Sequence, residues 1–171
     1  MGTAPKAKGK KPQRVVLDLD RYVPGLINFI SNKLSGGASS LYLRLFRVGI
    51  TEWRIISLLA VEGTISAHRI SQVIGFDKGL VSRTVKALEH RGIISITPDR
   101  LDGRRQTIEL TSAGLALHDQ IIQVALERER RLLADFSPEE VDVLVDLLRR
   151  MHAQIPRVNE YDPRAQAQRS G

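Results

Sequence analysis

The sequence of 171 residues predicts a mainly α-helical fold that contains one small β-hairpin. Two observations predict it. Apolar residues recur at helical spacing over most of the chain, and the period changes from 3.6 to 2 only around residues 94–97 and 107–110. The segment 77–110 holds a helix, a strand, a basic loop and a second strand, directly after another short helix. This order is typical of a winged helix-turn-helix.

Composition bounds the class of protein. A hydrophobic content of 42% can supply the core of one domain together with an assembly region. The chain has no cysteine, which excludes disulfides, thiolate metal sites, cysteine nucleophiles and thiol redox sensing. It has no long apolar run and no apolar core of a secretory signal, so we expect a cytoplasmic protein with no membrane partner.

Positive charge is concentrated in two places. The net charge is +7, and residues 1–14 carry only basic charges while residues 77–106 carry more basic than acidic side chains. This distribution points to a polyanionic partner. Residues 1–14 are too polar to bury, so we expect a disordered tail, either merely solvated or an arm that touches DNA phosphates; residues 157–171 form a second loose tail.

The N-terminal region, residues 15–50, has a helical apolar pattern on both sides of Gly36 and Gly37. Two glycines cost roughly 1 kcal/mol each relative to alanine inside a helix, so we expect a kink or an interruption there. Thr51 can cap the next helix, over residues 52–61, which has almost no polar face and should be buried nearly all round.

The helix-turn-helix follows. Ser66 can cap a short helix, and a turn at Gly75 and Phe76 leads to Asp77, the N-cap of a second helix that Arg91 and Gly92 close. On that second helix the residues opposite the apolar stripe can approach a major groove and donate to phosphates or base edges. They are Lys78, Gly79, Ser82, Arg83 and Lys86. The alternative is an ordinary solvated helix face.

The predicted hairpin carries basic residues at its tip. Ile94 and Ile96 alternate with polar residues in one strand, as Ile108 and Leu110 do in the other. Asp102 could orient an arginine toward a narrow minor groove, or it could be a simple Asp-Gly turn residue. The candidate DNA contacts of the loop are Arg100, Asp102, Arg104 and Arg105, and Ser66 at the first helix start completes the DNA-binding set.

Two long helices are predicted after the hairpin. Thr111 can cap a helix over residues 112–133, and Ser137 with Glu140 has capping-box spacing ahead of a last amphipathic helix. Their apolar stripes are too long for a small module to cover, which favours a two-fold dimer. We therefore divide the chain into 15–50 and 112–156 for dimerisation and 51–111 for DNA binding.

Catalytic and cofactor motifs are absent from the sequence. The four histidines do not approach metal-ligand spacing, and no glycine loop has the flanking residues of a phosphate site. We expect no enzyme activity, no cofactor and no metal.

The region 49–114 resembles the MarR family of bacterial transcription regulators. The resemblance rests on the stretches GITEWRIISLLA, ISQVIGFDKGLVSRTVKALEHRGII and DRLDGRRQTIELTSAG. It implies a homodimer that recognises palindromic double-stranded promoter sites. By residue, it implies that Lys78, Ser82, Arg83 and Lys86 read the major groove and that Asp102 and Arg104 belong to the wing motif.

The resemblance also implies a small effector that releases DNA, often an aromatic carboxylate, a phenolic compound or a thioester. The crevice for it would be lined by the first, second and fifth helices. Candidate contacts are Tyr22, Asn28, Arg44, Arg47, Trp53 and Arg54. Each has a simpler alternative, since Trp53 can be plain core and the arginines can be surface or phosphate contacts.

The sequence thus predicts a sequence-specific, homodimeric transcription regulator, a repressor released by a small ligand. Two alternatives stay open. A winged helix can serve as a protein-interaction module without reading DNA. A lysine-rich tail can also dominate in an architectural, non-specific DNA binder.

Overall fold

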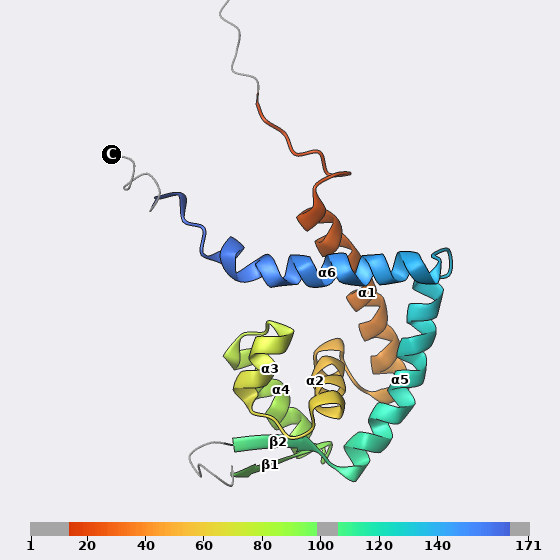
Figure 1. The fold of residues 1–171 in the computed structure, drawn as a ribbon. Helices are drawn as coiled ribbons and strands as arrows, with labels where there is room; N and C mark the ends of the chain where they lie inside the picture. Colours follow the sequence, from red (N-terminus) through yellow and green to blue (C-terminus); the bar gives the residue numbers. More distant parts are fainter. Residues whose placement is uncertain (1–13, 99–105, 165–171) are drawn as a thin grey trace, which may run out of the picture. The chain divides into compact units, whose positions relative to one another are not determined.

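The computed structural model describes residues 14–98 and 106–164. The described elements are, in chain order, α1 (Val23–Phe46), α2 (Ile50–Glu62), α3 (Ala67–Ile74), α4 (Lys78–His90), β1 (Ile94–Pro98), β2 (Gln106–Leu110), α5 (Ser112–Leu132) and α6 (Pro138–Asn159) (Figure 1). This confirms the mainly helical fold with one antiparallel hairpin. The predicted tail up to residue 13 and the predicted wing-tip contacts Arg100, Asp102, Arg104 and Arg105 lie outside the described residues.

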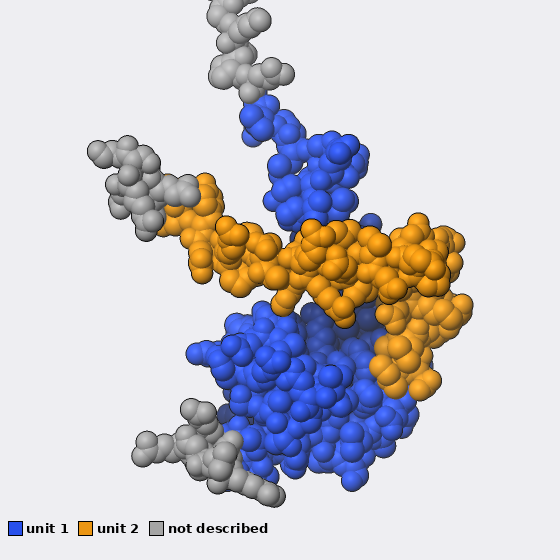
Figure 2. Space-filling model, viewed as in Figure 1, with its two compact units in different colours: residues 1–121 blue, residues 122–171 orange. Residues whose placement is uncertain are grey.

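The chain divides into two compact units, residues 1–121 and 122–171 (Figure 2). Helix α5 begins in the first unit and ends in the second. Among the described residues, no helix is both long enough and apolar enough to cross a membrane.

Helix α2 lies at the centre of the first unit, where it packs against α1, α3, α4 and β2. Its side chains Ile55 and Ile56 are fully buried, although Val61 at its C-terminal end is exposed. The helix starts two residues earlier than expected. Gly49, not Thr51, is its N-cap, and the Glu52 carboxylate accepts a hydrogen bond of 2.8 Å from the Gly49 N–H.

Helix α1 runs without a break from Val23 to Phe46, so the predicted interruption at Gly36 and Gly37 was wrong. The residues beyond the glycines explain the difference, because Ala38 and Tyr42 are buried in the first unit. Packing of that half of the helix offsets a propensity cost of roughly 1 kcal/mol per glycine.

Helix α4 ends as the sequence predicts. Gly92 has φ +69°, its N–H donates to the Glu89 carbonyl, and the Ile93 N–H donates 3.0 Å to the Leu88 carbonyl. This is the Schellman arrangement, and the side chains of Leu88 and Ile93 at its two ends are buried. The end of α4 at His90 is therefore fixed, and only three residues separate it from the start of β1 at Ile94.

The hairpin pairs Ile94 with Leu110 and Ile96 with Ile108, which confirms the two strands. Ile65, between α2 and α3, adds an isolated bridge to Ile108 through hydrogen bonds of 3.0 and 2.8 Å. The hairpin is thereby attached to the residue that precedes the first helix of the helix-turn-helix.

Helix α5 starts against the end of α4. The Thr111 hydroxyl accepts a hydrogen bond of 3.1 Å from the Gly114 N–H, as expected for an N-cap, and the Thr111 N–H donates 3.1 Å to the Ile93 carbonyl. Gly114 is buried directly beneath that carbonyl.

The second unit holds the rest of α5 and α6. Ser137 and Glu140 form the predicted capping box, with hydrogen bonds of 3.2 and 2.8 Å between side chain and backbone. Helix α6 extends to Asn159, beyond the boundary at 156 drawn from the sequence. None of its side chains is buried within the chain. Charged side chains of α5 pair within the helix, since Arg130 and Arg131 both donate to Glu127.

Gly114→Ala should destabilise the protein strongly. A Cβ at this position would collide with the backbone carbonyl of Ile93, which cannot rotate away. We expect a loss of about 2 kcal/mol or more in the free energy of unfolding, measured by urea denaturation. Gly36→Ala is the matched control, because nothing lies within 4 Å of its added Cβ; it should be neutral or stabilise by up to about 1 kcal/mol. Equal effects would contradict the packing described.

Glu127 should titrate abnormally. Hydrogen bonds from Arg130 and Arg131 lower the pKa of its carboxyl to about 2. Because folding lowers the pKa of Glu127, its interactions with the two arginines stabilise α5 at pH values above the ordinary pKa of a glutamate. This contribution is lost as the pH falls toward 2. Carboxyl-carbon NMR should show the low midpoint. In the double variant Arg130→Gln, Arg131→Gln the Glu127 pKa should rise toward its ordinary value; an unchanged midpoint would exclude the arginines as its cause.

Candidate nucleic-acid interface

The helix-turn-helix is built from two capped helices. The Ser66 hydroxyl accepts 3.2 Å from the Arg69 N–H at the start of α3, and the Asp77 carboxylate accepts 2.9 Å from the Leu80 N–H at the start of α4. Gly75 ends α3 with φ +77°, so the chain turns sharply between the helices. Both caps were expected from the sequence. Ser66 therefore has a local structural role at the place where a DNA contact was predicted.

Helix α4 has one buried and one exposed face. Val81, Thr84, Val85 and Leu88 are buried, and the Thr84 hydroxyl donates 2.9 Å to the Leu80 carbonyl, so the helix presents only backbone and apolar groups inward. All five predicted groove-facing residues of α4 are exposed. They are Lys78, Gly79, Ser82, Arg83 and Lys86. The structure thus gathers them on one outward surface, which we call the α4 face.

The cations of the α4 face are free to bind an anion. Within residues 14–98 and 106–164, none of Lys78, Arg83 and Lys86 has an ion-pair partner. Two nearby arginines differ. Arg69 is paired with Glu62 at 2.8 Å, where its hydrogen bonds lower the pKa of the Glu62 carboxyl, and Arg91 is paired with Glu52 at 2.8 Å.

Gly79 lets Arg83 lie close to the helix. A Cβ on Gly79 would stand 3.3 Å from Nη1 of Arg83 and 3.1 Å from Oδ1 of Asp77. The guanidinium therefore lies along the first turn of α4, near the capping carboxylate. A side chain on residue 79 would push either the cap or the arginine aside, and it would also stand between the backbone and a ligand.

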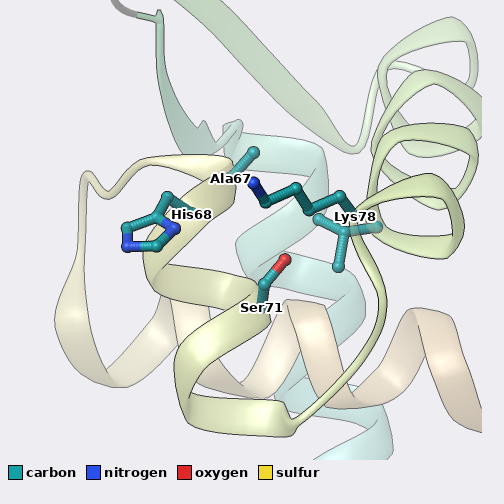
Figure 3. Close-up of a pocket in the computed structure, with 5 residues that line it drawn as sticks. Ala67, His68, Ser71 and Lys78 are labelled. Carbon is teal, nitrogen blue, oxygen red and sulfur yellow. The ribbon is translucent and has the colours of Figure 1, made fainter.

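A hollow of about 310 Å³ lies between α3 and α4, lined by Ala67, His68, Ser71, Lys78 and Val81. Figure 3 shows the Lys78 side chain extending from α4 toward α3, with the Ser71 hydroxyl directed into the same space. His68 and Ser71 were not among the predicted site residues. Their signal was present, because both are polar and neither is fully buried, but polar residues on a short helix do not stand out without a partner.

The hairpin base is the part of the wing that the structure describes. Thr97 and Thr107 face each other with hydroxyl oxygens 3.1 Å apart. Glu109 accepts hydrogen bonds from Thr64 at 2.9 Å and Ser95 at 3.4 Å. These contacts tie both strands to the turn before α3, so the hairpin and the helix-turn-helix form one framework.

The six predicted ligand contacts do not come together within the chain. Tyr22 and Arg47 lie at opposite ends of α1, which at 1.5 Å per residue are ~36 Å apart. Asn28 and Arg44 are exposed between them. Such a span exceeds one small-molecule pocket.

The other two candidates are engaged in the protein interior. Trp53 is 8% exposed, with His118 stacked on its ring at 5.6 Å and Tyr42 against its edge at 5.9 Å. Arg54 is half-buried and donates 2.8 Å to the Ser35 hydroxyl. The aromatic face of Trp53 toward α5 is occupied by His118, so a ligand ring could not stack there without displacing it.

The α4 face can recognise a ligand through its hydrogen-bond donors. Ammonium, guanidinium and hydroxyl groups project from a rigid helix, and such groups bind phosphate oxygens and the acceptor-rich edges of bases. Charge, shape and support by the hairpin together make this surface a candidate DNA interface.

Comparison with known proteins agrees with this geometry. The family model described as "MarR family" matches residues 48–105. A MarR/EmrR family transcriptional regulator from Acinetobacter sp. ADP1 has a crystal structure that superposes with a TM-score of 0.77 at 38% identity, covering 82% of this chain and 99% of that one.

Two further proteins extend the comparison. YdgJ of Bacillus subtilis, an HTH-type transcriptional regulator, is 30% identical over 115 residues, which is 64% of this chain and 68% of YdgJ. The S. aureus MepR–DNA complex matches with a TM-score of 0.71 at 21% identity, covering 81% of this chain and 99% of MepR, which shows a shared fold.

Asp77→Ala should weaken the start of α4. The variant loses the acceptor for the Leu80 N–H, and we expect the free energy of unfolding to fall by about 1 kcal/mol in urea denaturation. Asp77→Asn keeps a capping oxygen and should retain most of the stability. If the two variants were equally unstable, the cap would not be the source of the effect.

Proposed function

Because the chain belongs to the MarR family of DNA-binding transcription regulators, we propose that it acts as a homodimeric repressor at a palindromic promoter site. Each protomer would place α4 in a major groove and its hairpin beside the neighbouring minor groove. A small aromatic carboxylate or its thioester would release the DNA. In this proposal the protein is cytoplasmic and has no enzyme activity.

The observation that carries the DNA-binding proposal is the α4 face. Lys78, Arg83 and Lys86 are exposed without acidic partners in the described chain, whereas Arg69 and Arg91 beside them are neutralised. An interaction module would have no need for this unpaired positive charge on the helix that enters a groove in related folds. MepR, which has the same fold, has been crystallised with DNA, in agreement with this placement.

The homodimer proposal is supported by exposed apolar side chains at both ends of the chain. In α1, Ile27 and Ile30 are 43% and 55% exposed; in α6, Leu147 and Ile155 are 44% and 49% exposed. Such exposed apolar faces favour burial against a partner. In a two-fold symmetric dimer, a second copy of the chain can bury the exposed faces of both α1 and α6. Two half-sites would then lie roughly one helical turn, ~34 Å, apart.

Ligand release and repression rest on family membership. A repressor needs only to occupy the promoter, and a ligand relieves it by binding the DNA-free form more tightly than the DNA-bound form. The predicted contacts inside one protomer do not form one pocket, so the effector site would have to use a subset of them.

Arg83→Ala should reduce affinity for the specific site by about tenfold or more and relax its base preference, because an arginine can bind a base edge bidentately. Affinity for random DNA should fall less. Fluorescence anisotropy with both duplexes at several salt concentrations measures this. Arg150→Ala is the matched control, since it removes the same charge from α6. Equal losses on specific and random DNA would contradict base reading by Arg83, and a wild-type protein without any site preference would favour the architectural alternative.

A ligand of the proposed class should raise the melting temperature of the DNA-free protein by mass action and lower its affinity for the operator. A thermal-shift screen of aromatic acids and their thioesters tests the first effect, and anisotropy in the presence of each hit tests the second. Hits that stabilise the protein without weakening DNA binding would argue against ligand-controlled release.

A further inference from the structure

One side chain of α2 joins the N-terminal helix to the turn of the helix-turn-helix. Nη2 of Arg54 donates 2.8 Å to the hydroxyl of Ser35 in α1. The same guanidinium lies 5.7 Å from the ring centroid of Phe76, over the aromatic face. Arg54 thus contacts two segments that are far apart in sequence and that do not belong to its own helix.

The Ser35 end of this connection lies in the middle of α1. The residues N-terminal to it include the exposed apolar side chains Ile27 and Ile30, while Ala38 and Tyr42 after it are buried in the same unit. Ser35 stands where α1 changes from an uncovered helix to a packed one. It is also next to Gly36, and glycine has a low intrinsic helix propensity.

The Phe76 end lies immediately before the recognition helix. Gly75 closes α3 with a left-handed conformation, and Asp77 caps α4 through the Leu80 N–H. Phe76 is the one residue between them, so its ring position is coupled through the backbone to the direction in which α4 starts. A planar cation over the ring restrains that position.

We propose that Arg54 is a positioning residue that transmits the placement of α1 to the first turn of α4, and so sets the operator affinity without touching DNA. The inference rests on the proposed function, because it concerns how the α4 face is held for DNA. A guanidinium suits the role, since it can donate in its plane to Ser35 while its flat face covers Phe76. Lysine has the same charge but lacks the planar guanidinium group with its several N–H donors.

The chain offers matched variants that separate positioning from folding. Arg54→Met removes both contacts at similar side-chain length, and Arg54→Lys keeps the cation. Ser35→Ala removes only the α1 contact, and Phe76→Leu removes only the contact in the turn. Lys33→Met deletes a positive charge from the exposed surface of α1, and it serves as the charge control.

Three quantities are measured for each full-length variant. They are the affinity for an operator obtained by selecting binding sites with the wild-type protein, the affinity for a random duplex of equal length, and the midpoint of urea denaturation. Arg54→Met should lower the operator-to-random affinity ratio by about tenfold, as substitutions that uncouple a two-site network do. Lysine should restore part of the ratio, and Lys33→Met should not change it. Ser35→Ala and Phe76→Leu should each cause most of the loss, and their combination should be no worse than Arg54→Met, because all three break the same connection.

Three outcomes would overturn the inference. The ratio could stay unchanged in Arg54→Met while the wild-type protein prefers its operator. Operator and random affinities could fall together with the urea midpoint, as expected for a purely structural residue. The Ser35 and Phe76 effects could add independently. A wild-type protein with no operator preference would instead overturn the proposed function, and the inference with it.

Discussion

The backbone carbonyl of Ile93 is the point on which the DNA-binding framework depends. It accepts a hydrogen bond of 3.1 Å from the Thr111 N–H, and the buried Gly114 packs directly against it. The Thr111 hydroxyl donates 2.7 Å to the neighbouring Gly92 carbonyl and lies 3.2 Å from the Ile93 carbonyl oxygen. Ile93 also closes the end of α4 through its N–H, and β1 starts at the next residue. The backbone of this one residue therefore fixes the end of the recognition helix, the start of the hairpin and the start of α5 relative to one another.

This junction explains how an exposed, flexible set of side chains can serve as a specific surface. The α4 face carries three long cationic side chains, which lose conformational entropy on binding and contribute specificity only if the helix beneath them is fixed. Asp77 fixes the start of α4, the Leu88 and Ile93 pair fixes its end, and the bridge between Ile65 and Ile108 ties the hairpin to α3. Arg54 adds a connection from α1 to the same framework.

What the sequence predicted well was encoded locally. The caps at Ser66, Asp77 and Ser137 and the turn at Gly92 depend on residues a few positions apart, and the structure confirms them. Features set by tertiary packing were not predictable in this way. The continuity of α1 depends on packing of the residues that follow its glycines. Arg54 hydrogen-bonds to Ser35, which lies in another helix. His68 and Lys78 line the same hollow only because α3 and α4 pack against each other. Four of the six predicted ligand residues lie along α1 or at its caps, and the length of that helix separates them.

We propose that two copies of the α4 face read a defined DNA sequence. Selection of binding sites from a random duplex library by the wild-type protein, followed by sequencing of the bound fraction, tests it most directly. We expect an enriched inverted repeat whose half-site centres lie one helical turn, ~34 Å, apart. A bound fraction without any enriched motif, or with a single unpaired half-site, would contradict it.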